Sequence, residues 1–177
     1  MKKILIISTL LFLGSFKSVG QTIQFNSEVN VKLDSSFVPF DQKEKLQYFE
    51  TLSNRKFKSY GRQPMTPGKT FKYGRMIITI DTLTYSELLP TLEKRKASQE
   101  ELVSLAPGFK FESKIVTLFN RRVLVSKYSA EYADVMNFVI ENSQKKGGVK
   151  GSISFLEADR EQAVKALEYI VSHSSQK

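Results

Sequence analysis

Two short segments with a strand-like apolar period constrain the fold of this chain most. In the segments 135–140 and 149–155, apolar residues recur at every second position. A period of two is typical of antiparallel strands that bury one face. The residues that share the apolar face are Met136, Phe138 and Ile140 in the first segment, and Val149, Ile153 and Phe155 in the second. The sequence therefore predicts neighbouring strands of an antiparallel sheet.

The glycine-rich stretch between these strands resembles a phosphate-binding loop in composition. Such a loop binds phosphate because it leads from a strand into the N-terminus of a helix, whose free amides face the anion. Here the glycines lead from one strand into another, and Lys150 precedes Gly151 where a phosphate loop has the reverse order. We therefore interpret Lys145–Gly148 as a hairpin connection without a phosphate site.

The remaining elements follow from turn residues and helix caps. We expect further strands at 22–25, 29–33, 75–85, 109–118 and 123–128, with Asn120 in the turn of the last pair. Capping boxes predict helices from about 42 to 53 and from Asp159 onward. The stretch 86–106 is helical in composition and forms either one helix or, because of Pro90 and a capping box at Ser98, two short helices. The segment 54–74, rich in glycine and proline, is predicted to be largely irregular. The final helix has an apolar stripe of Ala163, Val164, Leu167, Ile170 and Val171.

The first twenty residues have the pattern of an export signal. Lys2 and Lys3 precede an apolar run of about ten residues, and Ser18 and Gly20 stand where a signal peptidase requires small residues. A membrane-spanning helix needs about twenty apolar residues. We therefore expect a signal peptide at 1–20 and one α+β domain at 21–177, exported to the periplasm or secreted.

The inventory of reactive side chains restricts the chemistry. The chain has no cysteine, and its single histidine, His173, lies near the C-terminus, where we expect a frayed tail. We therefore expect no metal site and no cofactor. A carboxylate-based hydrolase stays open, since acidic residues far apart in sequence can meet in space. The acidic residues considered are Asp81, Glu112, Glu131, Asp134, Glu141 and Glu157.

One segment stands out by its charge. Between Thr51 and Ile80 there is no acidic residue, whereas seven cations alternate with aromatic residues. Cations and rings together suit a polyanion. The predicted binding residues are Arg55, Lys56, Lys58, Tyr60, Arg62, Lys69, Lys72, Tyr73 and Arg75. A second acid-free stretch, 113–130, would extend this surface if the two lay side by side.

Three functions remain open from these residues. The first is a non-catalytic accessory protein of the cell envelope that binds an anionic envelope component or a protein partner, not nucleic acid, through the basic segment. In the alternative interpretation, that segment is a solvated loop whose rings point into the core. The second function is the hydrolase, and the third is a structural subunit that joins an assembly through an exposed strand edge.

The order of elements resembles the Mog1/PsbP-like superfamily, which includes exported DcrB-like proteins. The resemblance rests on the strand "RMIITID", the helical stretch after it, the antiparallel run that follows, and the closing "GSISFLEADREQAVKALEYIVSHS". It implies an α/β/α sandwich with an antiparallel sheet of about five to seven strands packed with helices. Members are mostly accessory or binding proteins, which makes an enzyme less expected. The basic segment 54–74 has no counterpart in the family pattern.

Overall fold

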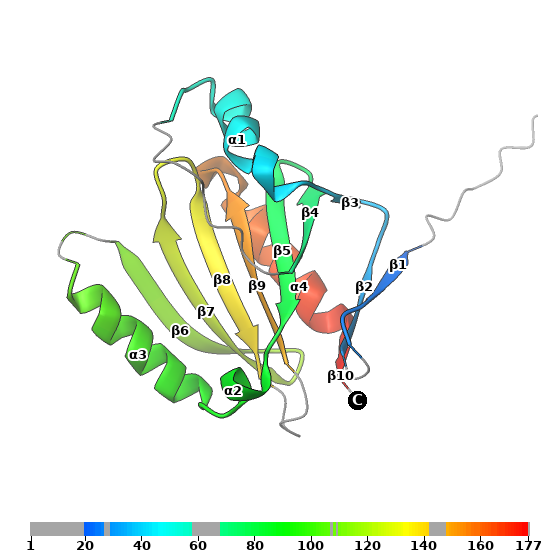
Figure 1. Cartoon of the computed structure of the whole chain (residues 1–177), viewed down its shortest axis with the longest axis vertical. Helices are drawn as coiled ribbons and strands as arrows, with labels where there is room; N and C mark the ends of the chain where they lie inside the picture. The colour runs from blue at the N-terminus through cyan, green and yellow to red at the C-terminus, as the bar shows by residue number, and fades with distance from the viewer. Residues whose placement is uncertain are drawn as a thin grey trace, which may run out of the picture.

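A large antiparallel sheet forms the centre of the protein (Figure 1). In this computed structural model the described residues are 20–26, 29–57, 68–106, 108, 110–141 and 148–176. The sheet has seven strands in the order β3-β4-β5-β9-β8-β7-β6. Their bounds are β3 Phe37–Pro39, β4 Lys69–Tyr73, β5 Met76–Thr82, β6 Phe111–Leu118, β7 Arg121–Ser129, β8 Asp134–Ile140 and β9 Val149–Phe155.

The two strands predicted by alternation are neighbours, β8 and β9, and their apolar residues are buried as expected. Ile140 pairs with Val149 across the hairpin. The tip, 142–147, lies outside the described residues, but the connection runs from strand to strand as predicted. Gly151 faces the ring of Phe138, which leaves no room for a side chain at that position.

Helices cover both faces of this sheet. On one face, α4 (Arg160–His173) buries Ala163, Ala166, Leu167, Ile170 and Val171 against the main core. On the other face lie α1 (Lys45–Ser53), preceded by the short 3-10 helix η1 (Gln42–Glu44), and α3 (Leu92–Ser104) (Figure 1). The alternation of strand side chains supports this assignment, since Ile78 packs with the α4 core and Ile77 packs with Phe49 of α1. The fold is thus an α/β/α sandwich.

A second, three-stranded sheet, in the order β1-β2-β10, encloses the C-terminal end of α4. Its strands are β1 (Gln21–Gln24), β2 (Val29–Leu33) and β10 (Ser174–Gln176). The predicted frayed tail is wrong, because Ser174 pairs with Val31 immediately after the helix. Arg121 fixes this junction by donating hydrogen bonds to the carbonyls of Val171 and Ser174. His173 remains exposed, with its ring stacked on Tyr169.

The helix boundaries correct part of the sequence prediction. Of the two alternatives for 86–106, the structure shows two helices, α2 (Tyr85–Leu88) and α3, but α3 begins after Thr91 and runs through Ser98 without a break. Proline is tolerated only before a helix or in its first turn, so Pro90 sets the division and Ser98 does not. Asp159 is the last residue of the short 3-10 helix η2 (Glu157–Asp159) and stands directly before α4, but its side chain caps no amide.

The prediction of an irregular segment at 54–74 is wrong for its last part. Lys69–Tyr73 forms β4, in which Phe71 lies opposite Ile78 of β5. The strand forms because Phe71 can be buried there and because Gly74, with φ of 57°, closes the hairpin to β5. Residues 58–67 lie outside the described residues.

Candidate functional site

The predicted basic segment divides into two described parts. Arg55 and Lys56 follow the C-terminus of α1, while Lys69, Lys72 and Tyr73 belong to β4 and Arg75 lies in the turn after it. The other three predicted binding residues, Lys58, Tyr60 and Arg62, lie outside the described residues. The sequence predicts that the remaining six residues share one surface, and the structure shows where each of them lies.

Strand geometry places Lys69 and Lys72 on opposite faces of the sheet. Successive side chains of a strand alternate between faces, so residues three apart point in opposite directions. The Lys69 ammonium lies 5.4 Å from the ring centre of Phe25 and 3.3 Å from the carbonyl oxygen of Gln24, near the small sheet. The Lys72 ammonium lies 5.1 Å from the ring centre of Tyr48, on α1. These two lysines therefore do not share a surface.

Tyr73 contributes to packing more than to a surface. Its ring centre lies 4.5 Å from that of Phe37, which is fully buried in the main core. Phe37 also contacts Tyr169 of α4 at 5.5 Å. Of the two predicted aromatic binding residues, Tyr73 thus belongs to the edge of the core, and Tyr60 is outside the described residues.

Around α1 the fold does bring cations and an aromatic ring together. The Tyr48 hydroxyl donates a hydrogen bond of 3.3 Å to the carbonyl of Gly74, which places the ring beside the turn that carries Arg75. Burial raises the pKa of Tyr48, and Arg75 partly offsets that effect. We define the α1 surface as Tyr48, Lys72 and Arg75 together with Arg55, which follows the C-terminus of α1. Tyr48 was not predicted, although its position next to Phe49 places it beside the apolar stripe of this helix.

Ion pairs decide which of these cations are available to a partner. Lys56 pairs with Glu50 at 3.1 Å, and Arg75 pairs with Asp159 at 3.5 Å. Within the described part of the chain, neither Arg55 nor Lys72 has an acidic partner, and both are exposed. The α1 surface therefore presents uncompensated positive charge at Arg55 and Lys72.

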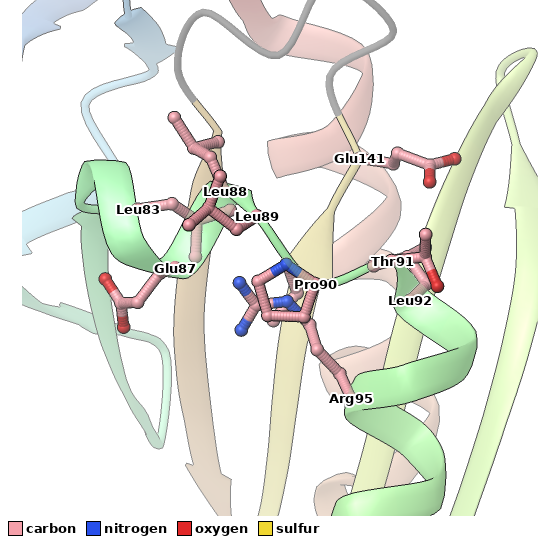
Figure 2. A pocket seen from close by; sticks show the side chains of 10 residues that line it. Leu83, Glu87, Leu88, Leu89, Pro90, Thr91, Leu92, Arg95 and Glu141 are labelled. Atoms are coloured by element: carbon pink, nitrogen blue, oxygen red, sulfur yellow. The ribbon is translucent and has the colours of Figure 1, made fainter.

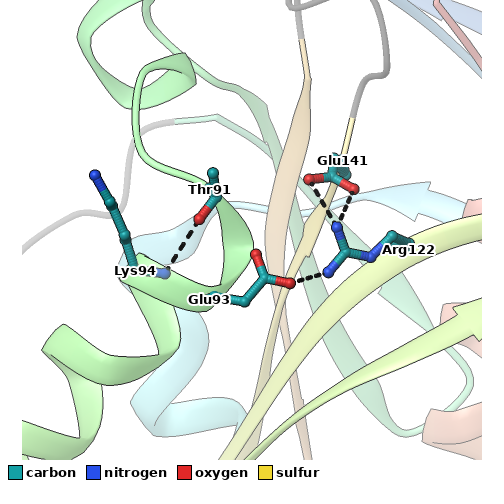
Figure 3. Close-up of polar contacts among 5 residues, drawn as sticks. All are labelled: Thr91, Glu93, Lys94, Arg122 and Glu141. Atoms are coloured by element: carbon teal, nitrogen blue, oxygen red, sulfur yellow. Dashed lines mark hydrogen bonds and ion pairs between the residues drawn. The ribbon is translucent and has the colours of Figure 1, made fainter.

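The second acid-free stretch does not extend this surface. It forms β6 and β7, which lie at the far end of the strand order from β4. Arg122 of β7 is moreover held by two acidic residues, Glu93 and Glu141, as Figure 3 shows. The two basic stretches thus lie apart.

Most of the acidic residues considered for a hydrolase are compensated by cations. Lys150 pairs with Asp81 at 3.8 Å, and Arg160 contacts Asp134 and Glu157. Lys150 also donates a 2.5 Å hydrogen bond to Glu87, a further acidic residue that was not among those considered. Desolvation raises the pKa of Glu87, but hydrogen bonds from Lys150 and Thr84 outweigh it and bring the pKa to about 2. A general acid needs a raised pKa. This arrangement gives no support to the hydrolase.

The described residues offer neither a metal site nor a membrane-spanning helix. They contain no group of three or more histidine, cysteine, aspartate or glutamate residues that could hold a metal ion. None of the helices among them has the length and apolar character needed to cross a membrane.

Comparison with known proteins places the fold. The structure is similar to cyanobacterial PsbP from Synechocystis, with a TM-score of 0.50 and 10% identity over 93% of this chain and 96% of that one. The Ran-binding protein Mog1p of Saccharomyces cerevisiae gives a TM-score of 0.49 at 12% identity, over 90% of this chain and 96% of that one. The Pseudomonas aeruginosa protein PA94 gives a TM-score of 0.37 at 12% identity, over 84% of this chain and 94% of that one.

Sequence comparison adds nothing to this result, since no protein-family model matches the chain and no curated protein matches it. At 10% identity the likeness to PsbP shows the fold alone. It agrees with the element order observed here, from β5 through the antiparallel run to the closing β9 and α4. The chain therefore has a Mog1/PsbP-like fold, as its order of elements predicts.

Proposed function

We propose that this protein is an exported, non-catalytic accessory protein of the cell envelope that binds an anionic partner through the α1 surface. The observation that carries the proposal is that Lys72, beside Tyr48 of α1, and Arg55, after the C-terminus of α1, are both exposed with no acidic partner in the described part of the chain. Tyr48 lies beside Lys72 and supplies an aromatic face. Cations next to a ring suit carboxylate or phosphate groups carried on an apolar or sugar scaffold.

The overall charge supports the same proposal. The formal net charge is +9, and it falls to +6 if the first twenty residues, with Lys2, Lys3 and Lys17, are removed. A positive protein attracts anionic surfaces in the envelope and binds them less tightly as salt screens the charges.

The test is retention of the protein on a heparin column in a salt series. The variant Arg55→Glu/Lys72→Glu reverses the two uncompensated charges, and we expect it to elute at much lower salt than the wild type. The matched control is Lys69→Glu with Lys165→Glu, which makes the same change in net charge at exposed positions outside the α1 surface. Equal early elution of both double variants would show only a net-charge effect and would refute the α1 surface.

A structural subunit remains the second candidate, because β6 is an eight-residue strand at one edge of the large sheet. An unpaired strand edge can bind another strand. Exposed Glu112 and Lys114 on β6 oppose such pairing, since charges are a common protection of edges. Light scattering after size exclusion decides: a monomer at all concentrations would exclude self-assembly through this edge.

A further inference from the structure

A pocket of about 280 Å³ lies between α2, the start of α3 and β8. It is at the end of the large sheet away from α1, so it is separate from the α1 surface (Figure 1). Its volume is just below the range of about 300–1,000 Å³ that is usual for small-molecule sites. The wall is mostly apolar and consists of Leu83, Leu88, Leu89, Pro90, Leu92 and Val139.

Arg95 is the cation of this pocket. It lies one helical turn before Gln99, whose side chain accepts a 2.6 Å hydrogen bond from Ser126 on the sheet, so both residues project toward the strands. Figure 2 shows the Arg95 guanidinium beside Pro90, within the ring of lining residues. The half-buried Arg95 side chain is therefore directed into the pocket, and its Nη2 is shielded from bulk solvent.

One nitrogen of the Arg95 guanidinium lacks a partner. This nitrogen, Nη2, is buried, and no hydrogen-bond acceptor for it exists among the described residues. More than about 90% of buried polar groups in native proteins have a partner, and a charged group without one is costly. An arginine kept in this position indicates that an acceptor from outside the chain belongs there.

The acidic residues at the rim do not supply that acceptor. Glu87 accepts hydrogen bonds from Lys150 at 2.5 Å and from the Thr84 amide at 2.7 Å. Glu141 accepts from Arg122 at 3.1 Å. In Figure 2 both carboxylates point outward, away from Arg95. The rim acids are thus compensated elsewhere, and the interior of the pocket combines one cation with apolar walls.

We propose that this pocket binds a small amphipathic carboxylate. The planar guanidinium of Arg95 matches a carboxylate with two parallel hydrogen bonds, and the hydrocarbon part of the ligand packs on the leucines and on Val139. A phosphate group fits less well, because Thr91 is the only other side chain in the lining that can donate a hydrogen bond to its further oxygens.

Octanoate is the probe, and 1-octanol is its uncharged equivalent of the same chain length. We expect octanoate to raise the unfolding temperature of the full chain in a concentration-dependent manner, and 1-octanol to give a much smaller shift. Arg95→Met keeps the apolar stem and removes the charge, so we expect at least a tenfold loss of octanoate affinity in calorimetry. Without ligand, this variant should unfold at or above the wild-type temperature, because it no longer buries an unpaired donor.

Two further variants make the test specific. Val139→Phe fills the pocket from β8 without touching the charge, and it should also abolish octanoate binding. Lys94→Met removes the same charge from the next residue, whose side chain points into solvent, and should bind like the wild type (Figure 3). Equal shifts from octanoate and octanol, unchanged affinity in Arg95→Met, or no octanoate binding would each overturn the proposal. None of these results would bear on heparin retention, which tests the α1 surface.

Discussion

Arg75 and Asp159 join the β4–β5 turn to the start of α4. The Arg75 Nε lies 3.5 Å from Asp159 Oδ2, and the Asp159 side chain is only 5% exposed whereas that of Arg75 is 51% exposed. The same Oδ2 has no hydrogen-bond partner in the described part of the chain, so the contact is an ion pair without an aligned hydrogen bond. The buried carboxylate therefore depends on Arg75 for compensation of its charge.

We predict that Arg75→Ala destabilises the protein by about 1–2 kcal/mol. Removing one partner of a fully buried pair costs about 3–5 kcal/mol, and the exposure of Arg75 reduces that figure through solvent screening. Asp159→Asn in the same chain should restore much of the loss, because it removes the uncompensated charge. Urea unfolding of the two single variants and the double variant gives the coupling energy. Strictly additive effects would mean that the pair contributes nothing.

The sequence predicted the sheet better than it predicted the site, and the residues show why. The alternation around Phe138 and Ile153 is local, so β8 and β9 could be identified without knowing their partners. In β4, by contrast, the density of glycine and proline just before Lys69 hides the strand. As long as β4 is not recognised as a strand, nothing in the sequence assigns Lys69 and Lys72 to different surfaces. Once it is recognised, the strand period of two places their side chains on opposite faces of the sheet. The predicted single basic surface follows from the omission of this strand.

Arg95 could not have been singled out from the sequence. It stands in a run of charged residues, 93–96, in which each cation looks equally exposed. Its burial depends on Pro90, which divides α2 from α3, and on Val139, which is far away in the sequence. Contacts of this kind depend on tertiary packing and leave no local pattern.

Because Lys45 is partly buried, we predict that the free energy of unfolding rises with pH above about pH 8. Burial lowers the pKa of Lys45 to about 8, and its ammonium lies 5.9 Å from the ring centre of Tyr132. Between about pH 8 and 10 the unfolded chain then binds more protons than the folded one, so the free energy of unfolding increases with pH. Burial also raises the pKa values of Tyr48 and Tyr132. The stability that these two neutral side chains contribute is therefore lost only as the pH rises through the range in which tyrosine ionises, above the range in which Lys45 acts.

The measurement is the unfolding free energy from pH 7 to 9.5 for the wild type and Lys45→Met. We expect the variant to be the more stable protein at pH 7 and the difference to shrink as the pH rises. Lys43→Met, which removes the same charge from an exposed position, is the matched control. A constant difference between wild type and Lys45→Met across this range would show that the lysine stays fully solvated.

Phe119 is expected to be replaceable with a gain in stability. It forms the two-residue turn between β6 and β7 with Asn120, and both have positive φ, 49° and 60°. This conformation suits asparagine and glycine and is unfavourable for a bulky residue. Because the Phe119 side chain is 62% exposed, little packing is lost with it. We predict that Phe119→Asn stabilises the protein by roughly 1 kcal/mol in thermal unfolding, and that Asn120→Val has the opposite effect.

Gly151 is predicted to be the least replaceable position of β9. It pairs with Ile80 on β5 and with Phe138 on β8, and an added Cβ would lie 2.4 Å from the Thr79 carbonyl oxygen and 2.5 Å from the Phe138 ring. Both distances are far below van der Waals contact, and the carbonyl belongs to a central strand that cannot move freely. We predict that Gly151→Ala destabilises the protein by about 2–3 kcal/mol in urea unfolding.

A second substitution separates the two contacts. Phe138→Leu shortens the side chain that Gly151 faces, so in the background of Gly151→Ala it should relieve the contact with the ring but leave the contact with the Thr79 carbonyl. The double variant should therefore recover only part of the loss, after correction for Phe138→Leu alone. Ser152→Ala, at the neighbouring half-buried position, should change stability little. If Gly151→Ala were as stable as Ser152→Ala, β9 would have to shift away from β5, and the register between Ile80 and Gly151 would be looser than the structure indicates.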